Sequence, residues 1–185
     1  MRRRARWVWG LISGVVHNVR RPPEVPSSVS QVPPGLLEIG GGKISQPDWT
    51  NLDPVHGEGM FRRRIQDGIP LPDASVRQAR ASHLMEHIPA GAERVHAMNE
   101  VWRVLVPGGT FEVVVPLFGG WGALADPTHM SFWVRESFDY FTGATLPDAD
   151  YGIRFWDLVE WTTRDFDWGT EGRALLAKPP ELAQP

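Results

Sequence analysis

Short runs of apolar residues alternate with helix-spaced stretches along most of this chain, beginning near Gly35. Runs rich in leucine, valine and aromatic residues predict strands, because such side chains suit a pleated and half-buried surface. The expected strands cover residues 36–39, 49–53, 76–82, 110–117, 155–161 and 173–178. Since helical patterns separate several of these runs, the sequence indicates an α/β architecture with a mostly parallel central sheet.

The clearest helix lies in the segment GAERVHAMNEVWRVLVPGG. Its apolar residues recur at three- and four-residue spacing and form one face, made of Val95, Met98, Val101, Trp102 and Leu105. The Pro-Gly-Gly triplet at 107–109 is expected to end the helix and to turn the chain into the next strand. A second helix is expected over residues 134–141.

The first 34 residues have a different composition from the rest. Their apolar run is shorter than the ~20 residues that a membrane span needs, and no small-residue cleavage site follows it as in a signal peptide. Prolines and serines fill residues 20–34, which is typical of an extended linker. We therefore expect a basic arm and linker at 1–34, with the arm packed on one domain at 35–185, and no stable membrane insertion.

Charge is distributed unevenly along the chain, although its net value is only −3. Six arginines precede Glu24, whereas all acidic residues lie at or after it, so the domain itself is strongly acidic. An acidic domain disfavours a nucleic-acid partner, although the arm alone could touch a phosphate surface or an anionic membrane. Cysteine is absent, which excludes disulfides and thiolate chemistry and suits the reducing cytoplasm, where we expect the protein.

Three consecutive glycines, Gly40, Gly41 and Gly42, follow the first expected strand, and Asp53 ends the second. Glycines let the backbone approach a ligand closely, and an acid at the next strand tip can accept hydrogen bonds from both hydroxyls of a ribose. Together they point to a nucleoside-containing cofactor. A dinucleotide fingerprint would need a glycine where Ser45 stands, which disfavours a nicotinamide dehydrogenase, and the chain has no phosphate loop of nucleotide hydrolases.

The series of motifs resembles the class I S-adenosylmethionine-dependent methyltransferases, and most of all their small bacterial and phage members. It runs in the family's order from about residue 35 to 141: LLEIGGGK, WTNLDP, IQDGIPLPDASV, ASHLMEHIP, EVWRVLVPGGTFEVVVP and DPTHMSFWVRESFDYF. The resemblance implies a Rossmann-like fold with helices on both faces of the sheet and S-adenosylmethionine as cofactor. It also implies the cofactor-binding residues, namely Glu38 and Gly40, Gly41 and Gly42 at the methionine part, Asp53 at the ribose, Asp67 at the adenine amino group, and Ser82 and His83 at the floor of the site.

Two segments depart from the family pattern. The connection between Gly42 and Trp49 contains Pro47 and is too short for a full crossover helix, so we expect an abbreviated first crossover. The strand VRQARAS places Arg77, Gln78 and Arg80 where a central parallel strand is normally apolar. Either this strand is partly exposed, or the fold is degraded and binds the cofactor weakly or not at all.

Two histidine-containing motifs supply candidate catalytic groups. HLMEH at 83–87 matches the H-x-x-E-H pattern of a class of zinc hydrolases, but Pro89 argues against the helix that this motif needs. Methyl transfer to an oxygen or nitrogen calls for a base, so we assign that role to His87 or His129, with Asp126 orienting the base or the acceptor. Alternatively, the segment Asp126-Pro127-Thr128 simply caps the helix after it.

The leading hypothesis is therefore a methyltransferase that modifies an oxygen or nitrogen of a small-molecule or saccharide-like acceptor, without a metal. The alternatives are a non-catalytic binding domain of the same fold and, less favoured, a zinc hydrolase.

Overall fold

The structure is a computed structural model that describes residues 35–43, 48–56, 61–145 and 151–180. The basic arm and linker expected at 1–34 lie outside these residues. Among the described residues, no helix combines the length and apolar character required to cross a membrane.

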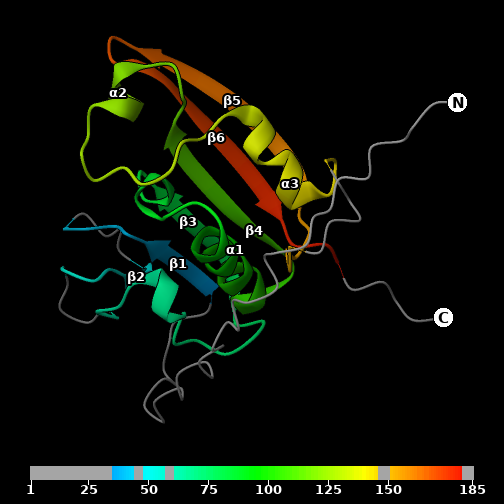
Figure 1. Cartoon of the computed structure of the whole chain (residues 1–185). Coiled ribbons are helices and arrows are strands. Elements are labelled where there is room, and N and C mark those ends of the chain that lie inside the picture. Colours follow the sequence, from blue (N-terminus) through cyan, green and yellow to red (C-terminus); the bar gives the residue numbers. More distant parts are fainter. Residues whose placement is uncertain (1–34, 44–47, 57–60, 146–150, 181–185) are drawn as a thin grey trace, which may run out of the picture.

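Six strands form one mixed sheet in the order β2-β1-β3-β4-β6-β5 (Figure 1). The strands β2, β1, β3 and β4 run parallel, whereas β6 is antiparallel to both β4 and β5. Their bounds are β1 Gly35–Ile39, β2 Thr50–Leu52, β3 Val76–Ser82, β4 Leu105–Pro116, β5 Asp157–Phe166 and β6 Gly169–Ala177. All six expected strands are therefore present, and the mostly parallel sheet is confirmed.

The helical elements are mostly short. They are η2 Ile65–Asp67, η3 Met85–His87, α1 Ala92–Val104, α2 Trp121–Leu124, η4 Arg135–Ser137 and α3 Asp139–Thr142. The predicted long helix is α1, but it ends at Val104, and Pro107 to Gly109 lie inside β4, at a register irregularity against β3. The helix expected over 134–141 is two single turns, η4 and α3, because Phe138 belongs to neither.

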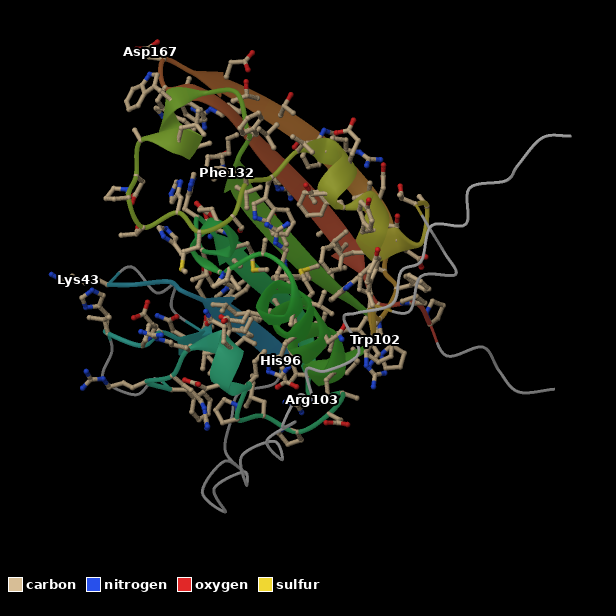
Figure 2. All side chains as sticks on the ribbon, viewed as in Figure 1. Lys43, His96, Trp102, Arg103, Phe132 and Asp167 are labelled. Carbon is tan, nitrogen blue, oxygen red and sulfur yellow. The ribbon has the colours of Figure 1, made fainter. Side chains whose placement is uncertain are left out.

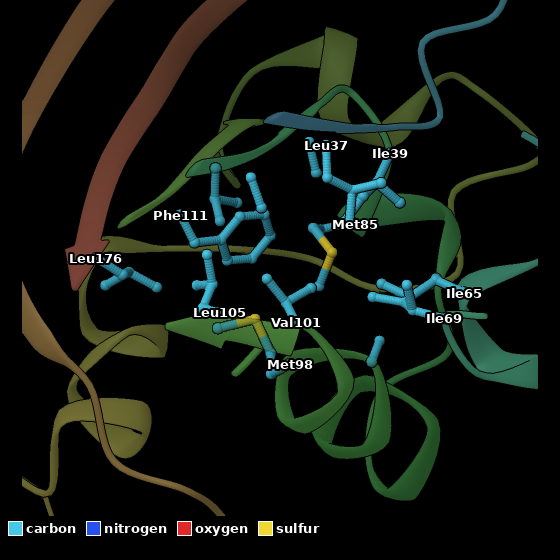
Figure 3. Packing of buried hydrophobic residues seen from close by; sticks show 14 of the residues in the cluster. Leu37, Ile39, Ile65, Ile69, Met85, Met98, Val101, Leu105, Phe111 and Leu176 are labelled. Atoms are coloured by element: carbon cyan, nitrogen blue, oxygen red, sulfur yellow. The ribbon is translucent and has the colours of Figure 1, made fainter. Parts of the chain in front are cut away.

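The core lies between α1 and one face of the sheet. Met98 and Val101 of α1 pack with Leu37 of β1 and Phe111 of β4 in one buried cluster (Figure 3). Apolar residues of η2 and α3 join the same cluster, so these helical elements cover the same face, and Figure 1 shows α1 and α3 in front of the sheet. Burial of this cluster is the main stabilising contribution to the fold.

The opposite face of the sheet carries a row of alternating charges across five strands. Arg80 lies in register between Glu38 and Glu112, with its Nε 3.0 Å from Oε1 of Glu112 and its Nη1 3.8 Å from Oε2 of Glu38. Arg173 continues the row from Glu112 to Glu160 on β5. Helices on both faces were expected, but α1, η2 and α3 all pack on the other face.

The polar pattern of β3 thus has a simple explanation. Ala79 and Ala81 face the core and are fully buried, whereas Gln78 and Arg80 point to the charged face and are partly exposed. The first of the two explanations given for this strand, partial exposure, is confirmed.

Replacing Arg80 by methionine should lower the free energy of unfolding by about 1 kcal/mol, because Glu38 and Glu112 would lose the cation between them. Urea denaturation of the variant measures the effect. Arg62→Met, at an exposed arginine outside the charged row, is the matched control. An equal loss in both variants would show that the row contributes nothing specific.

Candidate functional site

The glycine segment begins where β1 ends, at the carboxyl edge of the parallel strands. The backbone N–H of Gly40 donates to the carbonyl of Leu52 at 2.8 Å, which fastens the segment to β2. Gly40 and Gly42 adopt φ values of 71° and 58°, a region that residues with a Cβ rarely adopt. Gly41 is required for space instead, because an added Cβ would lie 2.7 Å from Cγ of Glu38.

Asn51 holds this segment in place, a role that the sequence reasoning missed. Its Oδ1 accepts a hydrogen bond from the N–H of Gly41 at 3.2 Å, and its Nδ2 donates to the carbonyl of Gly42 at 3.4 Å. Asn51 is 1% exposed in the short strand β2. Asparagine is depleted in strands, so a buried one two residues before Asp53 was the available signal.

Asp53 closes the same segment from the other side. Its Oδ2 accepts a hydrogen bond from the N–H of Gly42 at 3.0 Å, and its Oδ1 accepts from the N–H groups of Val55 and His56, both at 2.8 Å. Burial acts to raise the pKa of Asp53, but these three backbone donors outweigh it and hold the pKa below its usual value. A carboxylate accepts about four hydrogen bonds, so Asp53 has room for one more donor.

The side chain of Glu38 packs against Gly41 and is 4% exposed. Its Oε2 has no hydrogen-bond partner within the described residues, and the nearest cation is Nη1 of Arg80 at 3.8 Å. Burial raises the pKa of Glu38; Arg80 opposes this and Glu112 adds to it. A buried carboxylate with an unsatisfied oxygen is suited to bind a cationic group such as an ammonium.

Two further residues expected in the cofactor site are less closely tied to it. Asp67 is exposed at the end of η2 and forms no side-chain hydrogen bond or ion pair with the described residues. Ser82 is the last residue of β3, next to β1 at the same sheet edge, and is partly buried. The structure therefore brings Glu38, Gly40 to Gly42 and Asp53 together, with Ser82 nearby, but adds no contact for Asp67.

His83 follows β3 with an unusual backbone angle, φ 51°, which costs roughly 1–2 kcal/mol for a residue other than glycine. Its Nδ1 lies 3.4 Å from Oε1 of Glu86 and its Nε2 lies 2.9 Å from Oε2 of Glu171 on β6. The interaction with Glu86, and then that with Glu171, raises the pKa of His83 against the effect of burial. Sequence reasoning missed Glu171 as a partner of His83, because the two residues are far apart along the chain.

The segment between β4 and η4 brings the second histidine into place. The two ends of this segment are joined by a hydrogen bond, in which the N–H of Phe118 donates to the carbonyl of Trp133 at 2.8 Å. Further along, the N–H groups of Met130 and Ser131 both donate to the carbonyl of Glu86 in η3. As a result the rings of His87 and His129 meet with 4.8 Å between their centroids.

Asp126 stands beside this pair. Its Oδ1 accepts hydrogen bonds from the N–H and the hydroxyl of Thr128, at 2.8 and 2.6 Å, and its Oδ2 lies 3.8 Å from Nε2 of His129. These two hydrogen bonds, the side-chain one first, hold the pKa of Asp126 below its usual value. Asp126 thus closes a turn over Thr128, but no helix starts there, so the expectation of a helix cap at this point is wrong.

The zinc-hydrolase arrangement suggested by HLMEH is also absent. That motif needs one helix carrying both histidines, yet His83 precedes the single 3-10 turn η3 and interacts with Glu171. His87 instead pairs with His129 from the later segment. The glycine segment does lie against the segment that leads into η3, because a Cβ on Gly40 would lie 2.8 Å from Cδ1 of Leu84.

Comparison with known proteins supports the fold. No protein-family model matches the chain. A methyltransferase of Methanosarcina mazei that depends on S-adenosylmethionine aligns with a TM-score of 0.58 at 15% identity, over 83% of this chain and 96% of that one. A 1,6-didemethyltoxoflavin N1-methyltransferase of Burkholderia thailandensis, solved with its substrate and S-adenosylhomocysteine, aligns with a TM-score of 0.57 at 12% identity, over 80% and 72% of the two chains.

The chain has the fold of the class I methyltransferases. The resemblance noted in its motifs and the Rossmann-like fold class are therefore confirmed. The methyltransferase fold also places the glycine segment and Asp53 at the carboxyl edge of parallel strands, where ligands bind in open α/β sheets.

Curated relatives point in the same direction at the level of sequence. The demethylmenaquinone methyltransferases of Listeria monocytogenes serotype 4a and Listeria welshimeri are each 24% identical to the chain over 129 residues, which is 58% of this chain. The chain spans about half the length of these relatives, 49% and 50% respectively.

Proposed function

We propose that this protein uses S-adenosylmethionine to methylate an oxygen or nitrogen of a small-molecule acceptor. The observation that carries the proposal is the buried Oε2 of Glu38, unsatisfied among the described residues and directly beneath Gly41 in a methyltransferase fold. Curated relatives and similar structures that are methyltransferases support it.

The residues at the sheet edge fit this cofactor. Glu38 would bind the ammonium of its methionine part, and the spare lone pair of Asp53 would accept a hydrogen bond from a ribose hydroxyl. Because Gly41 has no Cβ, a ligand can closely approach the protein backbone next to Glu38. When bound, the cofactor supplies an electrophilic methyl group on a sulfonium sulfur.

The acceptor would lie beside the segment that follows β4. Phe118 and Phe132 pair there with ring centroids 5.8 Å apart and are about half exposed, and Trp121 is more exposed still. Exposed aromatic rings can stack on a flat heterocycle or on the apolar face of a sugar. A ring-shaped small molecule fits this chemistry, and the methyltransferase of Burkholderia thailandensis among the similar structures has 1,6-didemethyltoxoflavin bound.

The histidine pair would remove the acceptor's proton. In-line transfer needs the acceptor atom aligned with the methyl group and free of its proton when the new bond forms. We assign this step to Nε2 of His87 or His129, with Asp126 holding the turn that carries His129. The absence of a nucleic-acid partner stays a prediction, since a 16S rRNA methyltransferase of Catenulisporales acidiphilia is among the similar structures.

Titration calorimetry with S-adenosylmethionine and S-adenosylhomocysteine tests the cofactor site. Glu38→Gln should weaken the binding of both compounds by about 30-fold, because the amide carries no negative charge to attract their ammonium group. Since the pKa of Glu38 is raised, binding should also release a proton at mildly acidic pH, and affinity should rise as the pH rises through that pKa. Titrations in buffers of different ionisation enthalpy measure the released proton.

Glu160→Gln is the matched control, because Glu160 ends the charged row on β5 and should leave binding within threefold. A folded protein that binds neither compound would contradict the proposal. Binding without methyl transfer to any acceptor in a broad screen would favour the non-catalytic domain of the same fold.

A further inference from the structure

Hydrogen bonds join two segments that are far apart in sequence at the end of β3. Besides the two hydrogen bonds from the N–H groups of Met130 and Ser131 to the carbonyl of Glu86, the hydroxyl of Ser131 donates to the carbonyl of Met85 at 3.1 Å. The side chains of Glu86, His87 and His129 converge from these segments, and one ligand atom from each lies within 4.8 Å of the others. Hydrogen bonds between the two segments therefore bring the cluster together.

The hydrogen bonds of both histidines fix the same tautomer. Nδ1 of His129 lies 2.9 Å from the carbonyl oxygen of Ala123, which can only accept, so Nδ1 carries the proton. The hydroxyl of Thr128 donates to Asp126, so it accepts from Nδ1 of His87, which also faces the carbonyl of Thr128 at 3.2 Å. Both neutral rings therefore keep a lone pair on Nε2, as histidines that bind metals do.

Two carboxylates lie beside the histidine pair, those of Glu86 and Asp126. Glu86 is 1% exposed, and neither of its carboxylate oxygens has a hydrogen-bond partner within the described residues; Nδ1 of His83, at 3.4 Å, is a long electrostatic contact. Oδ2 of Asp126 lies 3.8 Å from Nε2 of His129. A general base explains one imidazole, but not a second one beside a buried carboxylate that lacks a partner.

We propose that this cluster binds a divalent transition-metal cation through Nε2 of His87, Nε2 of His129 and the carboxylate of Glu86. Asp126 lies at the open side and would be a fourth ligand. Imidazole with carboxylate and no sulfur suits zinc, cobalt or manganese better than magnesium. Ligand atoms in a tetrahedral zinc site lie about 3.3 Å apart, so small side-chain rotations would close the present cluster around the ion.

The site departs from the metal-free hypothesis drawn from the sequence, and it does not depend on methyl transfer. Its test is binding to the full chain, without a histidine tag, after dialysis against a chelator. Zinc is titrated by calorimetry, and cobalt by its visible absorption, which reports imidazole ligands directly. We expect one cation per chain at micromolar or tighter affinity, while magnesium should not bind at that level.

Two variants test the location of the metal site, one that truncates a side chain and one that is nearly isosteric. His129→Ala and Glu86→Gln should each weaken zinc binding by 30-fold or more, and His129→Ala should also change the cobalt spectrum. His96→Ala is the control, because His96 is exposed on α1 and lies away from Phe132, a residue of the segment that carries His129 (Figure 2). Thermal melts confirm that the variants fold, and Glu86→Gln keeps the shape of the buried side chain.

Zinc binding that is absent from the wild-type protein, or equal in the wild type and both site variants, would overturn the proposal. Equal binding would assign the cation to other surface histidines. Loss of zinc binding in the site variants with retained affinity for S-adenosylmethionine would establish the metal site independently of the cofactor site.

Discussion

Replacing Gly41 by alanine should weaken the binding of S-adenosylmethionine and S-adenosylhomocysteine by about 100-fold, or about 2.7 kcal/mol. The new Cβ would lie 2.7 Å from Cγ of Glu38 and 3.1 Å from both amide atoms of Asn51. Both neighbours are buried, so neither can move away easily. The substitution therefore displaces the carboxylate proposed to bind the ammonium and the amide that holds the glycine segment.

A substitution at Gly41 tests steric crowding alone, without added backbone strain. Gly40 and Gly42 have positive φ, so a substitution there would strain the backbone as well, whereas Gly41 does not. Gly108→Asn is the matched control, because Gly108 has φ 77° but open space around an added Cβ and lies far along β4. Calorimetric titration should find normal binding in that control. Normal binding in Gly41→Ala as well would remove the glycine segment from the cofactor site.

Most of the sheet could be predicted from the sequence because its signals are local. Apolar runs mark β1 and β4, and the three- and four-residue spacing marks the buried face of α1. Glycines after a strand and an acid at the tip of the next strand mark the edge where a ligand binds. These features depend on neighbours within a few residues, so one sequence is enough to find them.

The sequence-based predictions that were wrong or missing concern residues whose partners lie far away along the chain. Arg80 looked unsuited to a central strand because its partners Glu38 and Glu112 belong to other strands. His87 and Glu86 looked like half of a helical zinc motif, yet the side chain that joins them is His129, brought in by backbone hydrogen bonds from another segment. Pro107 to Gly109 looked like a helix stop but form an irregularity within β4, which only the pairing with β3 reveals.

The largest effect on turnover is expected from the combined variant His87→Ala and His129→Ala. Loss of a general base typically lowers a rate by about 10²- to 10⁴-fold, and a cation at the same site would be lost with it. Affinity for S-adenosylmethionine should stay within threefold, since Glu38 and the glycine segment are unchanged. The rate is measured as S-adenosylhomocysteine formed with the best acceptor from a screen of ring compounds that carry hydroxyl or amino groups.

The same acceptor distinguishes the two ways in which these histidines could act. In protein freed of metal, the Nε2 lone pairs remain available as bases, so turnover should persist after dialysis against a chelator and should be lost only in the double variant. If a cation activates the acceptor instead, chelation should abolish turnover and added zinc should restore it, because a bound cation favours the deprotonated oxygen. His96→Ala should behave as the wild type in both experiments. Unchanged turnover in the double variant would exclude both mechanisms and leave the pair a structural role between η3 and the segment that carries His129.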